Sequence, residues 1–155
     1  MIAASTWQWA LCFEEPESRT LWLGKATPRD WLAPGGAPLQ ARGLTTRYGR
    51  LDLRYVARLD PRGTYRVLVN LTLPRTITSR PPKGGIRVRI RAPPPYAGTL
   101  ARATVGGAAW VHVDAAAETV DFGAAQLTAA VVRGAGAIVA TFSPPPLATN
   151  ARESS

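Results

Sequence analysis

The chain has 155 residues, one cysteine and one histidine, and its 19 basic and 10 acidic residues give a formal net charge of +9. A chain of this length forms one domain with a proper hydrophobic core and leaves little room for two. The single cysteine, Cys12, excludes an internal disulfide framework and a cysteine-based zinc site, and no apolar run approaches the length of a membrane span.

The basic charge by itself does not identify an anionic partner. All the basic residues except Lys25 and Lys83 are arginine, in a chain that is also rich in Ala, Gly and Pro. This composition is typical of a GC-rich coding sequence, so we give bulk charge little weight as a sign of an anionic partner. The first residues lack the basic region and small-residue cleavage site of a signal peptide, which leaves the localisation open.

The N-terminal part predicts short strands and one helical turn. After an N-terminal segment of residues 1–6, apolar alternation over residues 7–13 predicts a strand, with the tail of a helix as the alternative. An apolar start is unusual and suggests that the chain is the end of something longer. Residues 20–23 predict a second strand, residues 28–32 a helical turn capped by Thr27, and residues 39–44 an edge strand.

The strongest signal is a hairpin formed by residues 50–59 and 64–73. The intervening Asp60-Pro61-Arg62-Gly63 fits a type I turn with a G1 bulge, which sets Asp60 opposite Thr64. One face then pairs Leu59 with Tyr65, Ala57 with Val67, Tyr55 with Val69, Leu53 with Leu71 and Leu51 with Leu73. The other face pairs Arg58 with Arg66, Val56 with Leu68 and Arg54 with Asn70. Because an outward Val and Leu pair is not typical of a solvated surface, we expect something to cover this second face.

The remaining sequence predicts further strands separated by turns. Residues 74–85 read as a polar loop, residues 86–91 as a strand with its arginines outward, and residues 118–122 as another short strand. Two hairpins are expected, from 100–105 with 108–113 and from 127–132 with 137–142, before a disordered tail at 143–155. The pattern predicts an all-β fold, an antiparallel β-sandwich of about eight to ten short strands over residues 7–142, with at most one or two helical turns.

No catalytic constellation emerges from the reactive residues. His112 is the only histidine, and with Asp114 it supplies too few groups for a nucleophilic triad or a metal site. The carboxylates lie in one turn or are scattered, so no pair is nominated for glycoside hydrolysis. We therefore expect this chain to be no enzyme by itself and to hold no cofactor or metal.

Aromatic and arginine residues supply the candidate binding sites. Trp31 and Trp110 lie near turns and are candidates for sugar stacking, whereas Trp7, Trp9 and Trp22 lie in apolar segments and fit the core or a partner interface. Outward arginines on two predicted strands form a candidate anion-binding stripe: Arg87, Arg89 and Arg91, with Arg50, Arg54 and Arg58. Only Tyr48 and Tyr96 are near them for stacking, and no nucleic-acid motif is present.

Several motifs together resemble a known family. They are WLGKATPRDWL at 22–32, TRYG at 46–49, residues 86–93, VGG with Trp110 at 105–110, and ETV at 118–120. In this order they resemble the C-terminal β-sandwich of (α/α)6-toroid proteins of glycoside hydrolase type. The resemblance implies a sandwich that packs beside a catalytic toroid absent from this chain, and it carries over no active-site residue.

Three functions follow as hypotheses. The first is a non-catalytic accessory domain that docks on and stabilises a catalytic (α/α)6 domain or a homologous partner chain, with Trp7, Trp9, Trp22, Val56 and Leu68 as contacts. The second is a stand-alone carbohydrate-binding module, which needs Trp31 or Trp110 exposed and a polysaccharide as partner. The third and less favoured is a basic nucleic-acid-binding domain that uses Arg87, Arg89 and Arg91.

Overall fold

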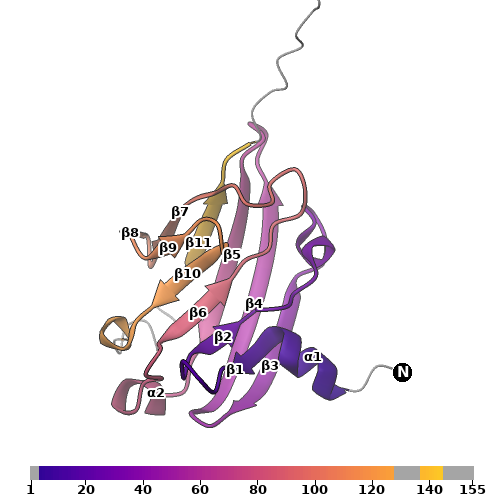
Figure 1. Cartoon of the computed structure of the whole chain (residues 1–155). Helices are drawn as coiled ribbons and strands as arrows, with labels where there is room; N and C mark the ends of the chain where they lie inside the picture. The colour runs from indigo at the N-terminus through magenta and orange to yellow at the C-terminus, as the bar shows by residue number, and fades with distance from the viewer. Residues whose placement is uncertain (1–3, 128–136, 145–155) are drawn as a thin grey trace, which may run out of the picture.

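The computed structural model describes residues 4–127 and 137–144, which form two β-sheets packed face to face (Figure 1). The five-stranded sheet has the order β1 (Cys12–Glu14), β2 (Leu21–Leu23), β6 (Ile86–Arg89), β10 (Thr119–Phe122), β9 (Val113–Asp114). The six-stranded sheet has the order β3 (Leu39–Thr46), β4 (Gly49–Leu59), β5 (Tyr65–Thr72), β11 (Ile138–Phe142), β7 (Leu100–Val105), β8 (Ala108–Trp110). The helical elements are α1 (Ala4–Leu11), α2 (Thr76–Ser79) and two 3-10 turns, η1 (Arg29–Leu32) and η2 (Ala124–Gln126).

The expected all-β sandwich is confirmed, with one correction to its strand directions. Every strand pair of the described chain is antiparallel except β2 and β6, which run parallel and align Leu21 with Ile86 and Leu23 with Val88. Between β2 and β6 the chain forms β3, β4 and β5 of the other sheet. A crossover connection of this length permits β2 and β6 to pair in parallel.

The central hairpin has the register that its turn predicts. The strands β4 and β5 pair from Asp52 with Thr72 to Leu59 with Tyr65. The Asp60 N–H donates a hydrogen bond to the Thr64 carbonyl across the turn. Gly63 adopts φ +76°, where a side chain would be strained. The inward face is buried except next to the turn, where Ala57 is half-buried and Leu59 is 47% exposed.

Large side chains from both sheets fill the core and join the two layers. Tyr55, Tyr65, Phe122 and Phe142 are among the fully buried residues. The hydroxyl of Tyr55 on β4 donates to the carbonyl of Arg89 on β6 at 3.1 Å, and its burial raises the pKa of Tyr55. Gly24 lies against this contact: a Cβ there would stand 2.5 Å from the Tyr55 hydroxyl, so the approach requires glycine.

The N-terminal apolar segment was wrongly predicted as a strand over residues 7–13. Residues 4–11 form helix α1 and only Cys12–Glu14 join the sheet, which agrees with the alternative of a helix tail. The alternation failed as a guide because Trp7 and Trp9 are both substantially exposed while Leu11 is buried. The expected cap at Thr27 is also wrong: Pro28 occupies the cap position, and the buried Thr27 hydroxyl has no hydrogen-bond partner.

Three later predictions are corrected by the structure, one by a helix and two by the strand pairing. The loop over 74–85 contains α2, whose Ile77 is fully buried. The strand expected at 108–113 divides, with β8 in one sheet and β9 in the other. Since β11 is bonded on one side to β5 and on the other to β7, it has no free edge for a hairpin with 127–132. Residues 128–136 and 145–155 of the expected hairpin and tail lie outside the described residues.

Candidate functional site

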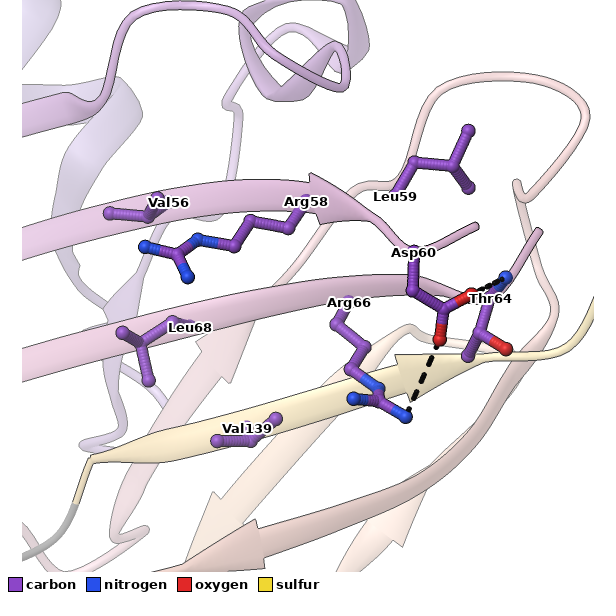
Figure 2. Close-up of a pocket in the computed structure, with 8 residues that line it drawn as sticks. All are labelled: Val56, Arg58, Leu59, Asp60, Thr64, Arg66, Leu68 and Val139. Atoms are coloured by element: carbon purple, nitrogen blue, oxygen red, sulfur yellow. Dashed lines mark hydrogen bonds and ion pairs between the residues drawn. The ribbon is translucent and has the colours of Figure 1, made fainter. Parts of the chain in front are cut away.

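The outer face of the six-stranded sheet carries an apolar row edged by arginine. Val56 on β4 pairs with Leu68 on β5, and Leu68 pairs with Val139 on β11, so these three side chains lie side by side across three strands. We call them the Val56 row. Together with Arg58, Leu59, Asp60, Thr64 and Arg66 they line an open hollow of about 300 Å³ (Figure 2).

A second row of polar residues runs beside the Val56 row. Arg58 pairs with Arg66, Arg66 with Thr141, and Thr141 with Arg102, which places three arginines in one row across four strands. Like charges directly opposite one another on a sheet destabilise it, so this arrangement has a cost in the isolated domain. Figure 2 shows the Arg58 side chain extending back along β4 toward Val56, so its methylene stem flanks the apolar row.

Most of this positive charge lacks an acidic partner. Asp60 lies 3.6 Å from Arg66, and hydrogen bonds from Thr64 and Arg62, together with Arg66, hold the pKa of Asp60 below its ordinary value. Within residues 4–127 and 137–144, no carboxylate lies within 4 Å of the exposed Arg54, Arg58 or Arg102. The face therefore combines an apolar centre with an uncompensated basic surround, a pattern that fits a partner with an apolar, acid-edged patch.

Of the five tryptophans, two are exposed to solvent and three are half-buried or buried. Trp9 is 64% and Trp7 40% exposed on α1, and the Trp7 ring lies 4.7 Å from that of half-buried Trp31. Trp110 is also half-buried: it packs 5.0 Å from Phe122, and its indole N–H donates to the Asp121 carbonyl. Trp22 is only 9% exposed, beneath Lys25 and Arg87. Neither sugar-stacking candidate, Trp31 or Trp110, is a free platform, and the exposed indoles belong to α1.

The three arginines of the candidate anion stripe have different environments. Arg87 lies over Trp22 and 3.9 Å from Asp121. Arg89 donates to the carbonyls of Ala117 and Lys25, and Arg91 donates to the carbonyl of Thr27. Arg89 and Arg91 therefore use some of their N–H donors to hold neighbouring loops against β6 and its C-terminal end.

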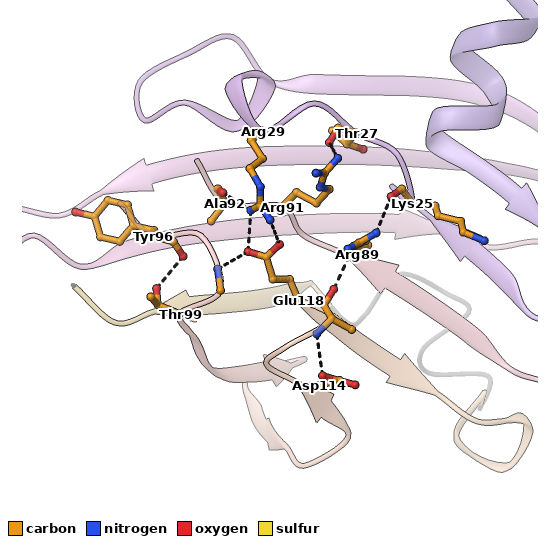
Figure 3. Close-up of polar contacts among 12 residues, drawn as sticks. Lys25, Thr27, Arg29, Arg89, Arg91, Ala92, Tyr96, Thr99, Asp114 and Glu118 are labelled. Atoms are coloured by element: carbon orange, nitrogen blue, oxygen red, sulfur yellow. Dashed lines mark hydrogen bonds and ion pairs between the residues drawn. The ribbon is translucent and has the colours of Figure 1, made fainter. Parts of the chain in front are cut away.

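A buried ion pair that the sequence did not reveal joins three segments (Figure 3). Glu118 is 1% exposed, and Arg29 reaches its two carboxylate oxygens at 2.9 and 2.8 Å. The same carboxylate accepts the Gly98 N–H at 2.7 Å, and Arg29 also donates to the Ala92 carbonyl. Glu118 has φ +56°, an uncommon conformation for a residue with a side chain, so the surrounding contacts must hold it. Because these bonds join the segments of Arg29, Gly98 and Glu118, we call the pair a structural clamp.

The other titratable candidates remain apart. His112 is exposed, and its ring lies against Trp110 and 3.4 Å from the Gln126 amide. In the part of the chain that the structure describes, no group of three or more His, Cys, Asp or Glu side chains is placed to hold a metal ion. Nor is any described helix long and apolar enough to cross a membrane.

Comparisons with protein-family models, with curated proteins and with solved structures found no match.

Proposed function

We propose that this chain is a non-catalytic β-sandwich accessory domain, which docks on and stabilises the catalytic (α/α)6 domain of a glycoside hydrolase-like protein. The observation that carries the proposal is the Val56 row, edged by arginines that lack acidic partners. The resemblance at residues 22–32 and 46–49 supplies the identity of the partner.

The geometry supports docking through this face. Rows of side chains on neighbouring strands lie about 4.8 Å apart, so Val56, Leu68 and Val139 present a continuous apolar strip about 10 Å wide. Each is only half-buried in the described chain, so a partner could remove further apolar surface from water. Arginine is favoured at interfaces because its guanidinium binds carboxylates bidentately and its stem packs on apolar surface.

The test is calorimetric titration of the purified chain with a toroid domain from the family that the sequence resembles. Leu68→Ser interrupts the apolar strip, and Arg58→Glu reverses one charge at its edge. Arg19→Glu makes the same charge reversal on an exposed residue between β1 and β2, away from this face, and is the matched control. We expect the two face variants to bind about tenfold more weakly and the control to bind like the parent chain. A parent chain that does not bind, or three variants with equal affinity, would contradict the proposal.

A further inference from the structure

A second surface, on the outer side of the five-stranded sheet, combines an exposed indole and a half-buried phenyl ring with cations. Trp9, Phe13, Lys25, Ala26, Arg89 and Arg91 line a groove of about 420 Å³ beside α1. We propose that this groove binds an acidic pyranose, a uronate or sulfated sugar unit of a polysaccharide. The site is independent of the docking face, which lies on the opposite side of the sandwich.

The two arginines are held in place without being neutralised. Arg89 donates from Nε to Ala117 and from Nη1 to Lys25, and Arg91 donates from Nη1 to Thr27, in each case to a neutral backbone carbonyl (Figure 3). No described carboxylate lies within 4 Å of either guanidinium. Since a guanidinium carries five N–H donors, each arginine keeps donors for a ligand. Both are therefore positioned in advance, which lowers the entropy cost of binding an anion.

The aromatic wall supplies the second element of recognition. Trp9 is 64% exposed, and its ring centroid lies 5.8 Å from that of Phe13. Lys25 Nζ stands 4.3 Å from the Phe13 centroid and 3.1 Å from a Glu15 oxygen, so its charge is partly balanced. The C–H face of a pyranose ring can pack on such an indole while an acidic substituent reaches Arg89 and Arg91. The groove falls within the range of about 300–1,000 Å³ that small-molecule sites occupy.

The arrangement favours a short acidic saccharide over a nucleic-acid strand. Binding to single strands uses successive stacked bases along a continuous basic groove. Here Trp9 is the one strongly exposed ring of the groove, and Arg87, the next arginine along β6, packs over buried Trp22 near Asp121. The groove thus offers one strongly exposed indole beside Lys25, Arg89 and Arg91, which suits one or two sugar rings.

Binding is measured by calorimetry at about 0.15 M salt, where exposed charges beyond about 8 Å are screened. The probes are trigalacturonate, a sulfated chondroitin disaccharide, maltotriose, tripolyphosphate and a short oligothymidylate. We expect one or both acidic saccharides to bind at least about tenfold more tightly than maltotriose and tripolyphosphate. The stronger of the two identifies carboxylate or sulfate as the acidic group. The proposal would be overturned if neither acidic saccharide binds, if tripolyphosphate binds as tightly as the preferred saccharide, or if oligothymidylate binds more tightly than it.

Variants then locate the site. Trp9→Ala removes the stacking face from an exposed helical position, and Arg91→Gln removes one charge; each should weaken the preferred saccharide about tenfold. Trp9→Phe should recover part of the affinity. Arg54→Gln on the other sheet removes the same charge far from the groove and should leave the affinity unchanged. If Arg54→Gln weakens binding as much as Arg91→Gln, or if Trp9→Ala has no effect, the groove is not the site. Urea unfolding of each variant shows whether a loss of binding reflects a loss of folding.

Discussion

The buried Arg29 and Glu118 pair gives the sharpest prediction about stability. Glu118→Ala leaves the Arg29 guanidinium and the Gly98 N–H without their shared acceptor. Removing one partner of a buried ion pair typically costs about 3–5 kcal/mol. Because the Arg29 side chain is 30% exposed and can regain water, we expect the lower end, about 3 kcal/mol. In a chain of this size that loss lowers the melting temperature by about 6–12 °C.

The assay is urea unfolding followed by tryptophan fluorescence, for the parent chain, Arg29→Ala, Glu118→Ala and the double variant. Such a cycle isolates the pairwise interaction, and we expect a coupling of about 2 kcal/mol. Glu17→Ala, at an exposed position in the turn after β1, should change the free energy of unfolding by less than about 0.5 kcal/mol. The clamp would be refuted as a stabilising interaction if Glu118→Ala lowered the free energy of unfolding by less than about 1 kcal/mol. The same would follow if the effects of the two single variants simply added up in the double variant.

Three further predictions concern the core and one turn. Gly24→Ala should destabilise the fold by about 2 kcal/mol in urea unfolding. The new Cβ would clash with the Tyr55 hydroxyl, and Gly24 has φ +70°, which is strained for alanine. A variant as stable as the parent chain would show that the contact relaxes freely. Burial, with a smaller effect of Glu14, raises the pKa of the Cys12 thiol to about 12, so iodoacetamide at pH 8 should label Cys12 only in urea; rapid labelling of the folded chain would contradict this burial. Hydrogen bonds from Thr64 hold the pKa of Asp60 below its ordinary 3.8, so the ionised carboxylate stabilises the turn above that pH and its effect is lost as the pH falls through the folded pKa. Asp60→Asn should therefore flatten the dependence of stability on pH in that acidic window, and an unchanged profile would exclude this role.

The central hairpin was predictable because its information is local. Alternation fixed which residues of β4 and β5 face inward, and Gly63 fixed the turn, so the pairing of Arg58 with Arg66 and of Val56 with Leu68 followed. The third member of the apolar row, Val139, was missed because β11 was expected to pair with 127–132, whereas it inserts between β5 and β7. Nothing local in the sequence encodes that insertion.

The clamp and the groove depend on contacts between distant segments. Arg29 and Glu118 are 89 residues apart, and no motif connects them. In the groove, the outward direction of Arg89 and Arg91 was predictable from the alternation of their strand. That Trp9 lies beside them was not, because it depends on helix α1, and the alternation over 7–13 predicts a strand there. A short apolar run does not by itself distinguish a strand from a helix, and here Trp7 and Trp9 lie on α1 against different neighbours, Trp31 and Phe13.

The most direct test of docking is arginine labelling with phenylglyoxal, read by mass spectrometry on the free chain and on its mixture with the toroid domain. Our account predicts that Arg54, Arg58 and Arg102, exposed on the outer face of the six-stranded sheet, lose reactivity in the mixture, while Arg19 and Arg87 react as before. Protection of Arg87 with unchanged labelling of Arg58 would place the partner on the other sheet and contradict the proposed docking face.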